Sequence, residues 1–485
     1  MDSAHLLSQM STATSPNFES LAKILIEASE ANIARIESQI RDLERLRDQE
    51  RGLITRLRVA IAPIHKLPAE ILVEIFRLAL DTWSYTRKQR IQKVQALSHV
   101  CAYWRRVAHT TPRLWTEMLF TRLDKTPKSD YMACMKGWLE RSAPMPIPVY
   151  LEISGKARDA CEALMDIIAT AAHRWSDVHL TLPSLSVLSR IPTASLKSLE
   201  RVFLQSTDAK HRADSTRVFL MAEHLHHARF ATRRTGQLLM PWSQLTEIEV
   251  TDPSPQECLD TLVQCTSIVS AHFETGAWPD VPDPSQRPIT TLGRLEDLSV
   301  SVRGCVVPFF VCLALPALKK LCLESHMDDW SPWGSVEFTQ FQLRSPSIQC
   351  LEINSSYLLS SDLLAVLQHA PLLAELQMES CPNSFDDSVV GALQYTTTQT
   401  LPLVPRLEVI QLYYAEVSFE EDALDAMIQS RWWTDEQLLA LPSPPKVARW
   451  SSIDIHCGDE EDNVTGELGA KLEQYRSQGL NVRVR

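Results

Sequence analysis

Glycine is scarce in this chain, since only 13 of its 485 residues are glycine. The sequence contains no glycine-rich phosphate loop, no GxSxG elbow and no HExxH zinc helix, which argues against the commonest nucleotide-binding, hydrolase and metalloprotease sites. It has no apolar run of transmembrane length, and its first residues lack the basic start and apolar core of a secretory signal. The net charge of −12 argues against a basic nucleic-acid-binding surface. We therefore expect no enzyme, no membrane protein and no nucleic-acid-binding protein.

Metal-binding and disulfide patterns are also missing. His224, His226 and His227 form the densest histidine group, but adjacent residues cannot share a helix face, and no cysteine or carboxylate pair stands at ligand spacing. We interpret this group as a polar turn before a strand and expect no cofactor. None of the 11 cysteines forms a CxxC pair, and several, such as Cys312 and Cys322, sit in apolar stretches. Scattered reduced thiols of this kind are typical of a cytosolic or nuclear protein.

The N-terminal part predicts a disordered segment over residues 1–16 and one long helix over residues 17–60. The helical segment contains no proline and a single glycine, Gly52. Apolar residues recur in it at alternating spacings of three and four, the pattern of a coiled-coil seam. This seam comprises Ile33, Ile36, Ile40, Leu43, Ile54 and Leu57, and it is interrupted by Arg47 and Glu50. The pattern predicts either self-association through residues 33–57 or packing of the helix back onto its own chain.

Residues 61–120 predict a small helical module with surplus apolar surface. Pro68 fits the first turn of a helix that is apolar nearly all round, and a fifty-residue unit cannot cover such a helix by itself. A second helix is expected from the single stripe of Val94, Leu97, Cys101, Trp104 and Ala108. Thr111-Pro112 then predicts the start of a third short helix. The exposed apolar surface implies a partner.

This module resembles an F-box, which docks substrate receptors onto the Skp-type adaptor of cullin ubiquitin ligases. The resemblance rests on LPxEILxxIF followed by VCxxWRxxA and TPRLW, and it is closest to F-box-like proteins of mushroom-forming fungi. The connection over residues 81–93 is longer than the family pattern. By resemblance, the adaptor-binding residues are Leu67, Pro68, Glu70, Ile71, Leu72, Ile75, Phe76, Val100, Cys101 and Trp104. Some of them must form the core of the module, and the sequence does not divide the two sets. The alternative is a purely internal helical subdomain.

After a linker over residues 121–148, with a helix over 128–141 and a proline-rich end, residues 149–485 contain an irregular repeat. Its unit is apolar-x-x-apolar-x-apolar, the strand signature of a leucine-rich repeat, at intervals of mostly about 20–30 residues. Copies begin at Trp175, Leu199, Leu225, Leu245, Ile268, Leu295, Leu318, Ile348, Leu373, Leu407 and Trp450. Helical patterns fill several gaps, a final strand is expected at Val482 and Val484, and most copies lack the usual asparagine. The alternative is a globular α/β domain.

The strand residues that alternate with the apolar ones should line the concave face of such a solenoid. Ten of them are acidic and three, Arg201, Arg229 and Lys320, are basic, against 60 acidic and 48 basic residues in the whole chain. The acidic ones include Asp177, Glu274 and Asp454. The predicted substrate-binding residues are Glu247, Glu249, Asp297, Glu324, Glu352, Glu375, Gln377 and Glu379. This excess predicts either a partner with a basic segment or merely a solubilising surface.

The sequence thus predicts an α/β protein: a long helix and a three-helix F-box-like module, followed by a leucine-rich-repeat-like solenoid. By resemblance, it would be the substrate receptor of an SCF-type ligase, with a Skp-type adaptor, a cullin and a protein substrate as partners. The competing hypothesis is a coiled-coil and leucine-rich-repeat scaffold without a link to ubiquitin.

Overall fold

The computed structural model describes residues 16–80, 87–116, 119–123, 129–193, 196–206, 217–231, 239–251, 253–278, 288–304, 306–326, 333–397, 400–415, 419–457 and 466–484. The expected disordered segment at 1–16 lies almost wholly outside these residues. The chain divides into two compact units. One contains residues 1–83 and 95–108, and the other contains residues 84–94 and 109–485.

The N-terminal elements are helical. They are α2 (Pro16–Ile61), the 3-10 helix η1 (Pro63–Lys66), α3 (Ala69–Leu80), α4 (Arg87–His99), α5 (Ala102–His109) and the 3-10 helix η2 (Pro112–Trp115). The expected long helix is α2, and it ends directly before Pro63, whose ring cannot continue it. From residue 19 to residue 61, every residue except the half-buried Ala22 is classed as exposed, so within the described residues α2 does not pack against the rest of the chain.

The prediction of a single helix across residues 94–108 was wrong, because the chain leaves the helical conformation at Val100 and Cys101. The Cys101 side chain accepts the backbone N–H of Trp104 at 3.4 Å, as an N-cap residue does, and so starts the new helix α5. Arg105 Nε donates to the Ser98 carbonyl across the break at 3.0 Å. The sequence predicted a connection between helices over residues 81–93. Part of it is helical instead, because residues 87–93 form the first turns of α4.

The second unit contains a 14-stranded parallel sheet whose strands follow in chain order. These strands are β1 (Leu119–Leu123), β2 (Ile147–Ile153), β3 (Trp175–Leu182), β4 (Arg201–Ser206), β5 (His227–Ala231), β6 (Glu247–Thr251), β7 (Ser270–Ala277), β9 (Asp297–Arg303), β11 (Lys320–His326), β12 (Cys350–Asn354), β13 (Glu375–Glu379), β14 (Val409–Ala415), β15 (Ser452–Cys457) and β16 (Asn481–Val484). The short strands β8 (Thr290–Thr291) and β10 (Leu313–Ala314) pair separately.

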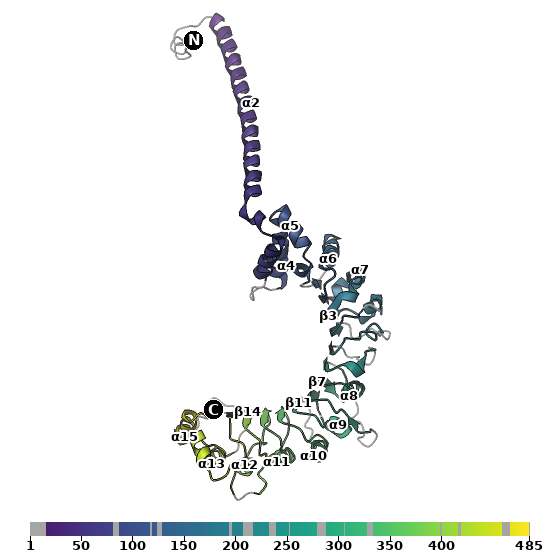
Figure 1. The fold of residues 1–485 in the computed structure, drawn as a ribbon, viewed down its shortest axis with the longest axis vertical. Helices are drawn as coiled ribbons and strands as arrows, with labels where there is room; N and C mark the ends of the chain where they lie inside the picture. The colour runs from purple at the N-terminus through teal and green to yellow at the C-terminus, as the bar shows by residue number, and fades with distance from the viewer. Residues whose placement is uncertain are drawn as a thin grey trace. The chain divides into compact units, whose positions relative to one another are not determined.

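Helices connect the strands and lie on one side of the strand row, as Figure 1 shows for α8 to α12. The α-helices are α6 (Ser129–Ser142), α7 (Arg158–Ala169), α8 (Pro255–Gln264), α9 (Val307–Cys312), α10 (Ser335–Arg344), α11 (Ser360–Gln368), α12 (Asp387–Leu393), α13 (Glu421–Ser430), α14 (Asp435–Ala440) and α15 (Gly466–Ser477). The 3-10 helices of this unit are η3 (Gly155–Ala157), η4 (Ala172–Arg174), η5 (Leu185–Arg190) and η7 (Trp242–Gln244).

Each repeat frame expected from the sequence, from Trp175 to Trp450, leads into a strand of this sheet. The reason is the period of two along a strand, which buries alternate residues, such as Leu351 and Ile353 in β12, against the helices. The solenoid-like α/β fold is thus confirmed. The sheet begins at β1, earlier than the predicted boundary at residue 149, because β1 pairs in register with β2.

One residue of the repeat signature was overlooked in the sequence, the cysteine that follows strand β13. Cys381 stands three residues after Met378, where the signature calls for asparagine or cysteine. Its buried thiol donates to the Ile353 carbonyl of the preceding repeat at 3.3 Å. The neighbouring Ser380, at φ 53°, turns the chain and donates its N–H to the Tyr413 carbonyl of the next strand. Together these residues connect three successive repeats at the end of β13.

Candidate protein-binding surfaces

The helix α3 carries one buried and one exposed apolar stripe. The buried stripe consists of Leu72, Phe76 and Leu80. The exposed stripe consists of Ile71, Ile75 and Leu78, which are 50%, 39% and 59% exposed. Spacings of four and three residues place the members of each stripe on one face of the helix. An exposed stripe of this kind costs solvation free energy unless a partner covers it.

The buried stripe is held by α5. The Trp104 and Phe76 rings are 4.9 Å apart between centroids, and the Tyr103 hydroxyl donates to the Leu67 carbonyl at 3.1 Å. In the described chain the buried Trp104 Nε1 has no hydrogen-bond partner. Trp104 therefore stabilises the module by apolar packing, while its buried indole N–H is left without a hydrogen bond, which costs some of that free energy.

The structure divides the predicted adaptor-binding residues, which the sequence alone did not. Exposed residues are Pro68, Glu70, Ile71, Ile75 and Val100; partly exposed residues are Leu67, Cys101 and Trp104; buried residues are Leu72 and Phe76. Leu78 is the member of the exposed stripe that the prediction omitted. Its spacing of three from Ile75 and seven from Ile71 could have identified it.

A second candidate surface is the open face of the sheet, which we define as the strand residues pointing away from the helices. All thirteen predicted charged positions belong to strands of this sheet and alternate there with buried residues. The strand register aligns them in rows across neighbouring strands: for example, Glu352 lies beside Gln377, which in turn lies beside Gln411. The register also adds Arg483, opposite Asp454, which the prediction had left out.

The open face over β2 to β5 is aromatic. The rings of Tyr150 and His179 are stacked with centroids 4.3 Å apart, and those of His179 and Phe203 with centroids 4.0 Å apart. The Arg229 guanidinium lies over the Phe203 ring at 5.2 Å. These side chains line a hollow of about 510 Å³ together with Asp177. This column of rings offers a partner flat apolar surface between charged side chains.

Two carboxylates of this region form ion pairs with arginines on the adjacent strand, and a third lies beside a histidine ring. Asp177 pairs with Arg201, Glu249 with Arg229 at 3.0 Å, and Glu247 lies 2.6 Å from His227 Nδ1. The predicted acidic surface is therefore absent from this part of the sheet. Glu247 and Glu249 are accordingly weaker candidates for binding a basic partner than the sequence suggested.

The acidic excess lies over β11 to β13, in a group that we call the acidic patch. It consists of Glu324, Glu352, Glu375 and Glu379. All four side chains are half-buried, and within the described residues none of them forms an ion pair with lysine, arginine or histidine. Lys320 is the basic residue of the open face on these strands. The patch thus retains negative charge that a cationic partner would neutralise.

Two thiols report on this negative charge. The pKa of Cys322 is raised to about 11, mainly by burial and secondly by the negative charge of the neighbouring Glu352 carboxylate. Burial raises the pKa of Cys350 to about 12, with Glu375 as the next cause. Both thiols are therefore protonated at neutral pH and chemically quiet.

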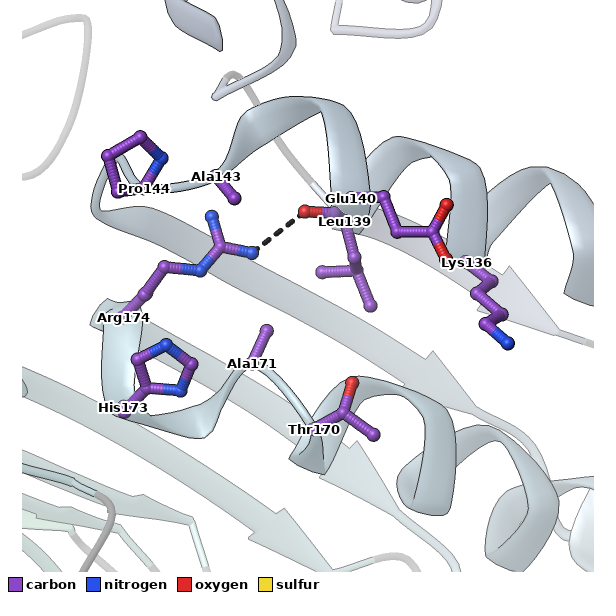
Figure 2. Close-up of a pocket in the computed structure, with 9 residues that line it drawn as sticks. All are labelled: Lys136, Leu139, Glu140, Ala143, Pro144, Thr170, Ala171, His173 and Arg174. Atoms are coloured by element: carbon purple, nitrogen blue, oxygen red, sulfur yellow. Dashed lines mark hydrogen bonds between the residues drawn. The ribbon is translucent and has the colours of Figure 1, made fainter.

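A pocket of about 450 Å³ lies beside the end of α6 and contains Arg174 (Figure 2). Its guanidinium donates to the Leu139 carbonyl at 2.8 Å, to Ser142 Oγ at 3.1 Å and to the Met145 carbonyl at 3.1 Å. Burial lowers the pKa of Arg174. Because its donors are engaged with the Leu139 carbonyl and Ser142 hydroxyl of α6 and with the Met145 carbonyl just beyond it, Arg174 fastens the end of this helix, and the pocket is no strong candidate site.

The histidine group expected to form a polar turn does so. His226 and His224 are exposed in the turn, where the His226 ring contacts the His224 carbonyl, and His227 starts β5. In the described part of the chain, no group of three or more metal-type side chains is close enough to hold a metal ion. Likewise, none of the described helices is both long enough and apolar enough to cross a membrane.

Comparison with known proteins gives one family match. Residues 64–121 match the F-box-like family model, which spans the chain from η1 into β1. No curated protein matches the chain. Among solved structures, the chain is similar to a leucine-rich-repeat protein of Leptospira interrogans, with 10% identity and a TM-score of 0.31, over 75% of this chain and 94% of that chain.

Proposed function

We propose that this chain is the substrate receptor of an SCF-type cullin ubiquitin ligase. The F-box-like domain at residues 64–121 would dock to a Skp-type adaptor and, through it, to a cullin. The observation that carries the proposal is the exposed stripe of α3, in a domain whose other apolar stripe is fully buried. Val100, in the break between α4 and α5, is also exposed, at 59%, and would be a further apolar contact.

The open face of the sheet would hold the substrate. Its acidic patch suits a protein segment that carries lysines or arginines, because unpaired carboxylates attract such a segment and favour it over acidic competitors. The aromatic column over β2 to β5 would take apolar or planar side chains of the same substrate. The predicted residues Asp297, Glu324, Glu352, Glu375, Gln377 and Glu379 remain the proposed contacts.

The chain would supply proximity and orientation rather than catalytic groups. In this role it is not an enzyme: it holds the substrate near the ubiquitin-transfer enzymes that the cullin recruits, which raises the effective concentration of the reacting groups. This function would place it in the cytosol or nucleus.

We also propose that the chain associates with itself through α2, because the predicted seam is exposed along its whole length. The same observation favours the second candidate function, a scaffold that joins partners through α2 and the repeats without a link to ubiquitin. Adaptor binding separates the two functions.

The test is co-purification with a Skp-type adaptor from the same organism. Ile75→Asp in the exposed stripe is expected to abolish binding, whereas Val336→Asp, at an exposed position of α10, is expected to leave it intact. Circular dichroism would confirm that both variants remain folded. Trp104→Ala is unsuitable as a test, because the Trp104 ring is part of the core around Phe76.

Stoichiometric adaptor binding that Ile75→Asp removes and Val336→Asp retains supports the receptor function. Failure of the intact chain to bind any Skp-type adaptor of its organism would reject that function and favour the scaffold.

A further inference from the structure

The exposed seam of α2 is longer and more regular than its apolar members alone suggest. Spacings of three and four continue without a slip from Ile33 to Ile61. The seam positions are Ile33, Ile36, Ile40, Leu43, Arg47, Glu50, Ile54, Leu57 and Ile61. The apolar members are between 44% and 74% exposed. Gly52, the weakest helix former of the segment, falls on the opposite face of the helix.

The two charged seam residues determine which direction of pairing is favourable. In a parallel pair of identical helices, each seam residue faces its own copy, so Arg47 would face Arg47 and Glu50 would face Glu50. In an antiparallel pair the order of the spacings is reversed in the second helix. A seam residue that follows a gap of four residues therefore faces one that follows a gap of three. With the twofold axis between residues 48 and 49, Arg47 then faces Glu50 of the second copy, and this contact occurs twice.

The same register brings the apolar seam residues together. Leu43 faces Ile54, Ile40 faces Leu57, and Ile36 faces Ile61, each pair occurring twice across the axis. The seam is flanked on one side by Glu37 and Glu44 in its first half and by Arg51 and Arg58 in its second half. Antiparallel pairing brings the acidic half of one helix beside the basic half of the other. Charge and apolar pattern therefore favour the same arrangement.

We infer that α2 pairs with α2 of a second copy of this chain as an antiparallel coiled coil centred between Arg47 and Glu50. This inference deepens the self-association proposed above and does not depend on adaptor docking. In the single chain, Arg47 Nε contacts Asp48 at 3.0 Å on the solvent side. Pairing provides Glu50 of the second copy as a further partner. At a rise of about 1.5 Å per residue, the start of the two F-box-like domains would be about 45 Å apart.

The mass of the full chain in solution tests the association. Sedimentation at micromolar concentration is expected to give about twice the 54.9 kDa of one chain. Ile54→Asp, in the seam, should raise the dissociation constant at least about a hundredfold, because two apolar layers are lost per pair. Val59→Asp is the matched control, since Val59 is 48% exposed against 47% for Ile54 but lies off the seam. A monomeric chain, or an equal effect of the two substitutions, would overturn the inference.

Disulfide cross-linking tests the direction. The Ile36→Cys/Ile61→Cys double variant is expected to form covalent dimers on mild oxidation, whereas each single variant is not, because identical positions lie about 35 Å apart or more in the antiparallel register. The unsubstituted chain, with its exposed Cys134, provides the background. Cross-linking of both single variants would show a parallel pair and overturn the inference. Absence of cross-linking in the double variant would exclude this register.

A charge exchange tests the centre of the pair. Arg47→Glu should weaken the dimer at least about tenfold, and Arg47→Glu/Glu50→Arg should restore it, because the opposite charges again face each other. Ile75→Asp, which removes the proposed adaptor contact, should leave the dimer mass unchanged. The failure of adaptor docking and the failure of self-association are thus distinguished in the same set of proteins.

Discussion

The indole ring of Trp104 lies 4.9 Å from the phenyl ring of Phe76, at an interplanar angle of 59°. This contact joins the two halves of the F-box-like motif, which lie on either side of α4 in the sequence. It also means that Leu72, Phe76 and Trp104 pack within the domain, while the exposed stripe of α3 remains available for a partner.

Phe76→Ala is expected to destabilise the F-box-like domain by about 3–5 kcal/mol, because the fully buried ring leaves a cavity beside Trp104. Ile75→Ala, on the exposed stripe, should change the stability by no more than about 0.5 kcal/mol. Hydrogen exchange of peptides from α3 measures both effects locally. Equal loss of protection in the two variants would contradict the division of the motif.

Arg431→Met is expected to destabilise the C-terminal repeats by about 3 kcal/mol. The fully buried Arg431 guanidinium donates to the Leu403 carbonyl at 2.7 Å and the Val404 carbonyl at 3.1 Å, and the substitution leaves these acceptors without their donor. Burial lowers the pKa of Arg431 to about 10, so it remains charged at neutral pH. Thermal unfolding would measure the loss, with the exposed Arg406→Met as the control; indistinguishable melting temperatures would refute the prediction.

Cys322 should resist alkylation in the folded chain at pH 8. Because burial and then Glu352 raise its pKa from 9.0 to about 11, its thiolate fraction at this pH is about a hundredfold below that of an ordinary thiol. Reactivity should rise only as the pH approaches 11. Iodoacetamide labelling followed by mass spectrometry measures it, with the exposed Cys134 as the reference.

Glu352→Gln should increase the labelling of Cys322, since one carboxylate that disfavours the thiolate is removed. Cys381, which is buried against the Ile353 carbonyl, should stay unlabelled in both proteins. Labelling of Cys322 that is rapid at pH 8, or unchanged by Glu352→Gln, would contradict the electrostatic account of the acidic patch.

A lysine decapeptide should bind to the acidic patch with strong dependence on salt. Its affinity is expected to fall at least about tenfold between about 50 mM and about 300 mM salt, because exposed charges are screened over shorter distances at high ionic strength. Replacing all four glutamates of the patch by glutamine should weaken binding by a similar factor. Fluorescence anisotropy of the labelled peptide would measure both.

The control for this experiment removes the same number of charges from the outer helices. It consists of Glu337→Gln, Asp422→Asn, Glu436→Gln and Glu467→Gln together. If this control weakened binding as much as the patch substitutions, net charge rather than the location of the patch would explain the effect. Binding that is indifferent to salt would reject the basic-segment hypothesis altogether.

Much of the repeat fold could be predicted from the sequence, because the period of two in each strand determines which residues are buried. The frames from Trp175 to Trp450 all lead into strands for this reason. The first strand, β1, could not be recognised, since it stands outside the repeating frame. The break at Val100 was also invisible, because a helical stripe read by spacing alone continues smoothly from Val94 to Ala108.

The candidate sites were predicted less completely than the fold. Charges on the open face could be identified from alternation, but their partners depend on strand register, which joins residues of different repeats. Arg229 and Glu249 are a pair only because β5 and β6 align in the register observed. Similarly, the division between Phe76 and Ile75 depends on where α5 packs, and a single helix cannot reveal this.

The open face differs along the sheet: paired charges and stacked rings lie over β2 to β6, and the carboxylates of the acidic patch lie over β11 to β13. A peptide with an aromatic side chain at one end and lysines at the other would satisfy both regions in one orientation and neither in the opposite orientation. The sheet would therefore distinguish such a sequence from the same residues in reversed order. This polarity would also determine which end of a bound substrate points towards the β1 end of the sheet.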